Sequence, residues 1–167
     1  MLLNRQNTKM IQRIQSVFLL LLALSMASVI FLPIWGKTDP LTNQELVLTS
    51  TKLAFVTPGS QTPAAVSTWP IAALAALSAA VALFEIFQYR SRFTQLKLGL
   101  LNLVLIVATI GANYYYSSVG EQMLNVKLIG TFEAGFYLPT LALILNLLAN
   151  RFIRRDEQLV RSMDRLR

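Results

Sequence analysis

The chain has 167 residues, of which 54% are hydrophobic and only 14% are charged, and its formal net charge is +7. Soluble domains carry about 25% charged residues, so this composition excludes an ordinary soluble domain and favours a membrane protein. The sequence contains no histidine and no cysteine, which removes the commonest general base, thiol chemistry and the usual zinc ligands. We therefore expect no enzyme activity, no metal site and no cofactor.

Four apolar runs follow one another along the chain, each about as long as the 20 residues that a helix needs to cross a hydrocarbon core. They cover residues 14–35, 69–89, 98–116 and 134–153. These runs predict an all-α membrane protein, a bundle of four transmembrane helices over residues 1–153 followed by a tail at 154–167. The first run is too long for the apolar part of a signal peptide, so we expect it to be retained.

The two connections on the expected outer side contain segments that favour strands. In the first connection (36–68), residues 45–56 are rich in β-branched and large apolar side chains, and a hairpin turn is expected near 49–52. In the second (117–133), apolar residues alternate weakly between 123 and 132. Two alternatives stay open: strands from both connections pair in a small cap, or both segments are irregular loops on the membrane.

Several polar residues lie within the apolar runs. Glu85 lies in the second run, and an ionisable residue at membrane depth is a candidate functional site. Its carboxylate could pair with Arg90 or Arg92, bind a cation, or reach the nearby boundary. Asn102 and Asn146 lie in the third and fourth runs, where amides ordinarily form interhelical hydrogen bonds. Glu85, Asn102 and Asn146 form the candidate intramembrane polar site, although we find no broken helix or internal repeat of the kind typical of transporters.

The C-terminal tail has the pattern of a short amphipathic helix. Leu159, Met163 and Leu166 are spaced i, i+4 and i+7, and Glu157 and Arg161 form an i, i+4 pair of opposite charge. Such a helix continues the fourth span or lies on the inner leaflet. Its role has two readings that the sequence leaves open: a solvated tail that orients the protein, or a docking helix for a cytoplasmic partner.

The basic residues are distributed unevenly among the connections. Twelve of the 15 Lys and Arg residues lie before the first run, between the second and third, or after the fourth. Positively charged segments stay on the cytoplasmic side, so both termini are expected to be cytoplasmic. There the basic residues meet the anionic headgroups of the bilayer, and each basic residue contributes about 1 kcal/mol to this attraction. The net positive charge is therefore explained without a nucleic acid. Interfacial aromatic residues support the same orientation, with Trp35, Trp69 and residues 114–116 at the outer boundary and Tyr89 at the inner one.

Three segments together carry a family resemblance. They are MIQRIQSVFLLL at residues 10–21, FEIFQYRSRFTQLK at 84–97 and RDEQLVRSMDRLR at 155–167. With these segments the chain resembles a family of small four-helix inner-membrane proteins of Bacteroidetes, known only as a domain of unknown function. The resemblance covers nearly the whole chain, and members of that family usually begin at the position that matches Met10. It implies four helices in a bacterial inner membrane and no established activity.

All three segments fall on the expected cytoplasmic side. The leading hypothesis is therefore a non-catalytic accessory or interaction subunit of a membrane complex, which binds a protein partner or a second copy of itself. The alternative is a small transporter or channel that uses Glu85 and the intramembrane Asn residues, and an enzyme acting on lipid or isoprenoid comes third. The candidate residues for contact with a partner or with lipid are Gln12, Arg13, Gln15, Arg90, Arg92, Gln95, Arg155, Asp156, Glu157, Leu159, Arg161, Asp164 and Arg165.

Overall fold

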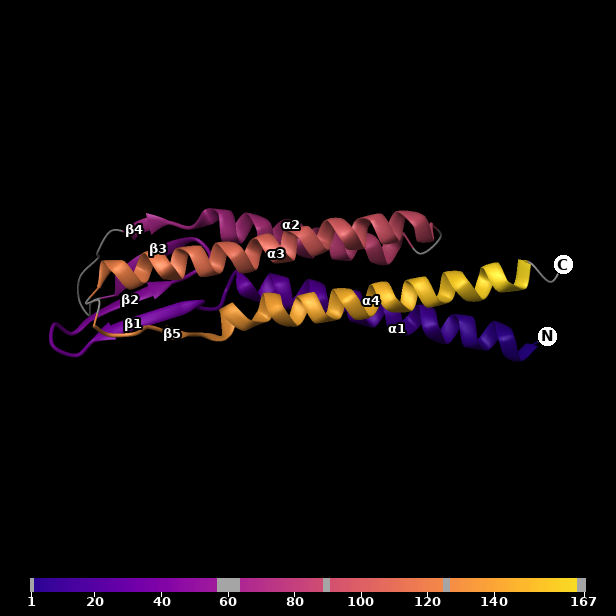
Figure 1. Cartoon of the computed structure of the whole chain (residues 1–167), viewed down its shortest axis with the longest axis horizontal. Coiled ribbons are helices and arrows are strands. Elements are labelled where there is room, and N and C mark those ends of the chain that lie inside the picture. The colour runs from indigo at the N-terminus through magenta and orange to yellow at the C-terminus, as the bar shows by residue number, and fades with distance from the viewer. Residues whose placement is uncertain (1, 57–63, 89–90, 125–126, 165–167) are drawn as a thin grey trace.

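The computed structural model describes residues 2–56, 64–88, 91–124 and 127–164. Its helices are α1 (Leu2–Val29), α2 (Trp69–Phe87), α3 (Arg92–Met123) and α4 (Ala134–Asp164). Its strands are β1 (Trp35–Asp39), β2 (Gln44–Leu48), β3 (Lys52–Val56), β4 (Ala64–Ser67) and β5 (Thr131–Phe132). The helices form an elongated bundle, and the sheet lies at one end of it (Figure 1).

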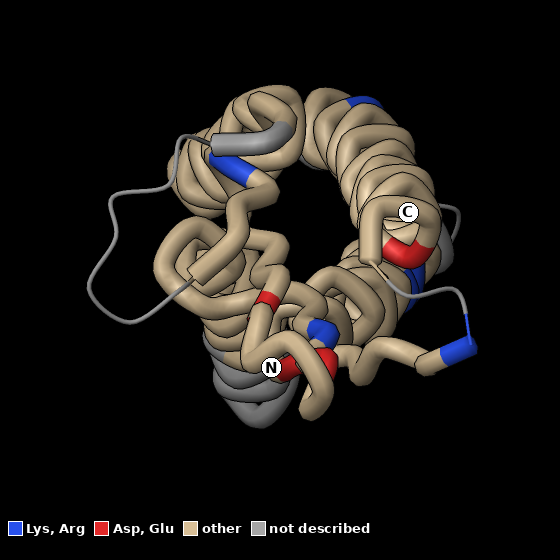
Figure 2. The backbone as a smooth tube through the Cα atoms, turned by 90° about the vertical axis from the view of Figure 1, so that its left-hand side faces the viewer, with Lys and Arg blue, Asp and Glu red and all other residues tan. Residues whose placement is uncertain are grey.

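The four helices are arranged around a common axis. α1 packs against α2 and α4, and α3 packs against the same two helices. Figure 2 shows this arrangement along the bundle, from the end that carries the sheet. Successive helices run in opposite directions, so both chain ends lie at the end of the bundle away from the sheet (Figure 1).

The bundle exposes apolar side chains and buries polar ones. On α3, Leu100 is 63% exposed and Val104 is 59% exposed, whereas Asn102 and Asn113 are fully buried. An apolar outer face suits contact with lipid, and buried amides are the usual means by which membrane helices bond to one another. Among the described residues, three helical segments are long and apolar enough to cross a membrane: α2, Phe93–Met123 of α3 and Ala134–Arg155 of α4. This confirms the second, third and fourth predicted runs as candidate spans.

The first predicted run, 14–35, is too long at its C-terminal end. α1 stops at Val29, and its apolar part, Ile14–Val29, is shorter than the other three candidates. Pro33 disfavours helical backbone at the residue before it and has no N–H to donate, which favours the end of the helix in this region. Trp35 instead begins β1 and is only 1% exposed. The ring is therefore enclosed by the protein instead of facing headgroups, and the position of Trp35 relative to the membrane boundary stays a prediction.

The predicted cap is present as a five-stranded antiparallel sheet with the order β4-β3-β2-β1-β5. Strands from both connections take part, since β1 pairs with β5 through Trp35↔Phe132. The segment 45–56 forms the β2–β3 hairpin, closed by a 2.9 Å hydrogen bond from the Thr49 N–H to the Lys52 carbonyl. This arrangement confirms the cap and excludes the alternative of two irregular loops.

The second connection differs from its prediction in length. A strand was expected between 123 and 132, but α3 continues to Met123 and β5 contains only Thr131 and Phe132. The hydroxyls of Ser117 and Ser118 both donate to the Tyr114 carbonyl, at 2.9 Å, and so bond within the helix. Residues 117–122, which the sequence pattern assigned to the outer connection, therefore lengthen the third helix, together with Met123 from the expected strand.

The sheet and the bundle share one core. Leu46, Leu48 and Leu53 of the sheet are fully buried together with Leu22 and Met26 of α1. Ser50 fixes the junction, because its hydroxyl donates to the Ile30 carbonyl at 2.8 Å and its own carbonyl accepts the Ala72 N–H at 3.2 Å. The end of α1 and the start of α2 are thus held at the same level, directly beneath the sheet.

Candidate functional site

A row of polar and small residues follows the buried face of α3. Successive members are three or four residues apart, which is the period of helices that pack side by side. Only Ile106 interrupts this row with a large apolar side chain, and the other buried residues are polar or glycine. We call this row the polar seam; it comprises Gln95, Gly99, Asn102, Ile106, Thr109, Asn113, Ser117 and Gly120.

Two hydrogen bonds connect the polar seam to α2. The hydroxyl of Ser78 donates to Oδ1 of Asn102 at 2.6 Å, and both residues are fully buried. Seven residues further along α2, the Glu85 carbonyl accepts a 3.1 Å bond from Nε2 of Gln95. The antiparallel helices are thus bonded at two levels, and interhelical bonds of this kind contribute about 0.6 kcal/mol each.

Glu85 lies at the second of these levels, the one nearer the predicted cytoplasmic end of the bundle. It is fully buried, and neither carboxyl oxygen has a hydrogen-bond partner among the described residues. Its side chain does not reach the surface, so the interpretation that it extends to the boundary is not supported. Of its predicted partners, Arg90 lies outside the described residues. For Arg92 the backbone is described but the side chain is not. A buried carboxyl group without a partner is costly, and such groups concentrate where a protein binds or conducts something.

Gln15 of α1 approaches the same depth as Glu85. Ser50 is hydrogen-bonded to both Ile30 and Ala72, which places these two residues at one level of the bundle. From that level, Gln15 lies about 20 Å along α1 and Glu85 lies about 20 Å along α2. Gln15 is 6% exposed. With Gln95, which is 3% exposed, these residues make the bundle interior polar at this depth.

A second polar group joins α3 to α4. Nδ2 of Asn146 donates to the Gly99 carbonyl at 3.0 Å, and Nδ2 of Asn150 donates to Oδ1 of Asn146 at 3.3 Å. A Cβ atom at Gly99 would overlap the Asn150 amide, so glycine allows the two helices to approach closely here. Asn146 therefore bonds to α3, as predicted for an intramembrane amide, but no hydrogen bond between Asn146 and Asn102 or Glu85 is seen in the described part of the chain.

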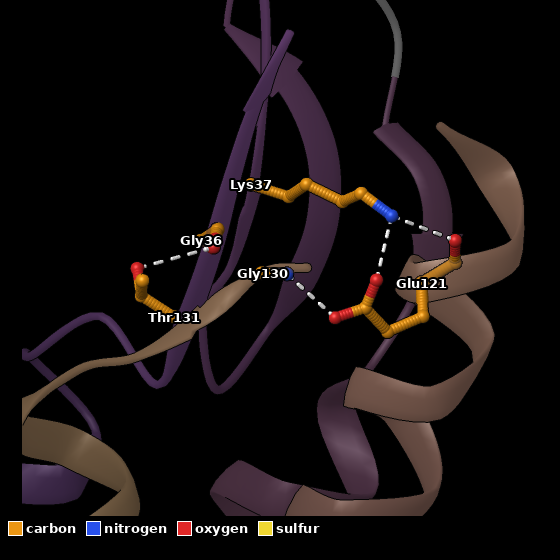
Figure 3. A network of polar contacts seen from close by, with 5 residues as sticks. All are labelled: Gly36, Lys37, Glu121, Gly130 and Thr131. Atoms are coloured by element: carbon orange, nitrogen blue, oxygen red, sulfur yellow. Dashed lines mark hydrogen bonds and ion pairs between the residues drawn. The ribbon is translucent and has the colours of Figure 1, made fainter. Parts of the chain in front are cut away.

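A polar network holds the sheet to the end of α3 (Figure 3). Nζ of Lys37 lies 2.6 Å from Oε2 of Glu121 and 3.0 Å from the Glu121 carbonyl. Oε1 of the same carboxylate accepts the Gly130 N–H at 2.7 Å. The Lys37 side chain is fully buried. The sequence did not indicate this pair, because the two residues are far apart in the chain.

The ring of Trp35 fills the space beside this network. A Cβ atom at Gly120 would lie 2.6 Å from Cζ3 of Trp35, and one at Gly130 would overlap the ring. The two glycines come from α3 and from the residues before β5. The tryptophan is thus enclosed by segments that only tertiary folding brings together.

The predicted contact face is only partly described. Gln15 and Gln95 were expected on that face, but both side chains are buried inside the bundle. Each lies on the side of its helix that packs against the neighbouring helices. Arg155 is exposed, as expected. The side chains of eight others are outside the described set: Gln12, Arg13, Arg92, Asp156, Glu157, Leu159, Arg161 and Asp164. Arg90 and Arg165 lie outside the described residues altogether.

No cluster of three or more Asp, Glu, His or Cys residues that could hold a metal ion occurs in the portion of the chain that the structure describes. One groove lies between α3 and α4, and its lining does not include Glu85, Asn102 or Asn146. The arrangement offers hydrogen-bonding amides and one buried carboxyl group rather than a paired acid and base.

The comparison with curated proteins found no match. The family model described as "Domain of unknown function (DUF4293)" matches residues 11–166, almost the entire chain. The match includes all five strands. It also includes all four helices, except for the first residues of α1. The chain therefore belongs to the DUF4293 family, a domain of unknown function.

Proposed function

We propose that this chain is a non-catalytic interaction subunit of a complex in a bacterial inner membrane. Its termini lie in the cytoplasm and its sheet lies on the outer side. The charge distribution supports this orientation, because the connections with few basic residues are those that build the sheet. The partner is a protein rather than a nucleic acid, since basic residues near the bilayer already meet anionic headgroups.

The observation that carries the proposal is the extension of α1 and α4 beyond the rest of the bundle. Figure 1 shows that both helices continue past the end of α2 and the start of α3. We call this extension the terminal arm, formed by residues 2–13 of α1 and 156–164 of α4. At its base, the rings of Phe18 and Phe152 are stacked with their centroids 5.5 Å apart. Helix that continues past the bundle has surface to offer a partner.

The sequence of the terminal arm suits a docking role. α4 continues without interruption to Asp164, so the tail is helical through Leu159 and Met163. An apolar stripe on a helix with basic neighbours can pack in the groove of a partner while its arginines pair with acidic residues. The candidate contact residues of the tail belong to the terminal arm, except Arg155 and Arg165, which flank it in the sequence.

The proposal is tested by affinity purification in mild detergent, comparing the full chain with a version that ends at Arg154. We expect a defined protein to copurify with the full chain only. A full chain that elutes alone as a homo-oligomer, or the same copurifying proteins with both versions, would overturn the docking role.

Point variants provide a matched control for the truncation. Replacing Leu159 and Met163 by serine removes the apolar stripe, whereas replacing Glu157 and Asp164 by serine changes the opposite face of the same helix. We expect the first pair to lose the copurifying protein and the second pair to retain it. Equal loss from both pairs would point to an unfolded tail and would count against a specific docking surface.

A small transporter or channel is the second candidate, and the polar seam favours it. Buried polar side chains on α3 continue from Gln95 to Ser117, with Glu85 unpartnered beside them among the described residues. Proton and monovalent-cation flux into vesicles that contain the purified protein tests this candidate. Flux that Glu85→Gln abolishes, and that Ser118→Ala at the rim of α3 leaves unchanged, would favour transport; vesicles that are no leakier than protein-free ones would rule it out.

A further inference from the structure

A groove lies on the outside of the bundle between α3 and α4, towards the end away from the sheet. Its volume is about 620 Å³, within the range of about 300–1,000 Å³ that is typical of ligand pockets. Leu96, Leu100, Leu103 and Leu147 line its apolar part. Arg151, Arg154, Arg155 and Gln158 line its polar part, with Asn150 between the two.

The lining changes from apolar to basic along the helix axis. On α4, Leu147 lies nearest the sheet and Arg155 lies eight residues further on, a separation of about 12 Å. Leu96 to Leu103 lie within the candidate span of α3, and Leu147 lies within that of α4. With the proposed membrane insertion, Leu100, Leu103 and Leu147 lie at hydrocarbon depth, and the arginines lie in the last five residues of the candidate span of α4.

The arginines of the groove are available to bind an anion. Arg151, Arg154 and Arg155 make no ion pair with any side chain that the structure describes; Lys37 and Glu121 form the ion pair seen there, at the opposite end of the molecule. Guanidinium groups bind phosphate with paired hydrogen bonds, and long basic side chains at a span end extend to the headgroup level. Basic pockets between membrane helices are typical sites for acidic lipid headgroups.

We propose that this groove binds one molecule of an acidic phospholipid. An acyl chain lies along Leu100, Leu103 and Leu147, and the phosphodiester lies between Arg151 and Arg154. A soluble anion would bind to the arginines without contacting the leucines. An acidic protein helix would not require apolar lining residues within the candidate membrane spans. The inference rests on the proposed membrane insertion but not on docking by the terminal arm, so the two can fail separately.

The test is native mass spectrometry of the full chain in mild detergent, titrated with phosphatidylglycerol or with phosphatidylcholine of the same acyl chains. We expect one phosphatidylglycerol to bind at least tenfold more tightly than phosphatidylcholine. The double variant Arg151→Gln, Arg154→Gln is expected to lose that preference. Lys97→Gln is the matched control, because Lys97 lies at the same end on α3, is exposed and lies over the ring of Phe93 rather than in the groove.

A second pair of variants tests the apolar part of the groove. Leu100→Trp places a larger ring in the groove, whereas Leu101→Trp adds the same ring at an exposed position outside it. We expect only Leu100→Trp to weaken phosphatidylglycerol binding, by at least tenfold. This comparison stands even if the arginine double variant fails to fold, which gel filtration and circular dichroism would reveal.

Several outcomes would overturn the lipid site. Equal binding of the two phospholipids would remove the role of charge. Equal behaviour of the arginine double variant and Lys97→Gln would place the binding elsewhere. Displacement of phosphatidylglycerol by an equal concentration of glycerol phosphate would show that the groove takes a free phosphate group. A protein that stays bound in the groove and excludes added lipid would show that it is a protein interface.

Discussion

Lys37 of β1 and Glu121 of the last turns of α3 form an ion pair with 2.6 Å between Nζ and Oε2. The lysine side chain is fully buried, and the carboxylate is 34% exposed. Because Glu121 also accepts the Gly130 N–H, one carboxylate joins the first strand, the third helix and the segment that leads into the last strand. This carboxylate adds a polar attachment of the sheet to the bundle, beside the shared core and the bonds of Ser50.

The first prediction concerns the loss of that carboxylate. Glu121→Ala leaves the Lys37 ammonium buried without its charged partner, and we expect the free energy of unfolding to fall by about 2 kcal/mol. Thermal unfolding in detergent measures the change. Gln122→Ala, at the exposed neighbouring position, is the control and should change stability by no more than about 0.5 kcal/mol.

The double variant Lys37→Met, Glu121→Leu sharpens this prediction. Replacing both partners of a buried ion pair by apolar residues is often nearly neutral, so the double variant should be more stable than Glu121→Ala alone. A double variant that is less stable than the single one would show that the ion pair itself, rather than the buried charge left behind, determines stability.

The second prediction concerns the enclosure of Trp35. Gly130→Ala and Gly120→Ala each place a methyl group against the indole ring, and overpacking of this kind typically lowers stability by about 1–3 kcal/mol. Gly111→Ala is the control within α3, where nothing lies within 4 Å of the added atom and alanine should stabilise the helix slightly. Adding Trp35→Phe should partly restore Gly130→Ala, and no restoration would show that the clash lies elsewhere.

The third prediction concerns Glu85. Glu85→Met replaces a buried carboxyl group without a described partner by an apolar side chain, so we expect stability to rise by about 1 kcal/mol or more. Ser78→Ala, which removes a bond between α2 and α3, should instead lower stability by about 0.6 kcal/mol. A destabilised Glu85→Met would mean that the carboxylate has a partner in the folded protein, and that Glu85 is a structural residue.

The fourth prediction concerns orientation, and the absence of cysteine from the sequence makes it simple to test. Leu41→Cys introduces a thiol in the turn between β1 and β2, where Leu41 is 86% exposed. Gln158→Cys introduces one near the start of the terminal arm. In bacteria whose outer membrane has been made permeable, a maleimide that cannot cross the inner membrane should label Leu41→Cys and spare Gln158→Cys, and the reverse pattern would invert the proposed orientation.

The helices and the sheet could largely be predicted from the sequence, because both depend on local patterns. The length of the apolar runs predicted the candidate spans of α2, α3 and α4, and the β-branched residues of 45–56 predicted the β2–β3 hairpin. The boundaries were less accurate. Trp35 has the character of an interfacial residue, but its environment is determined by Gly120 and Gly130, which come from distant parts of the chain.

The candidate site was harder to predict than the fold. Asn102 and Asn146 were identified as intramembrane amides, but their partners, Ser78 and the Gly99 carbonyl, depend on the register between helices. Gln95 was assigned to the exposed cytoplasmic face because polarity alone suggests exposure. In a membrane helix, a polar side chain is more often buried against another helix than exposed. The spacing of three and four residues from Gln95 to Gly120 was the signal in the sequence that these residues share one buried face.

The strand order β4-β3-β2-β1-β5 has a consequence for biosynthesis. Strands β1 to β4 leave the ribosome together, between α1 and α2, but β5 follows only after α3 is complete. Until then β1 keeps an open edge, which is a template for pairing with other chains. Closure of the sheet by Trp35↔Phe132 is thus a late step of assembly. A nascent chain can complete the sheet only after α2 and α3 have returned the polypeptide to the end of the bundle where β1 lies.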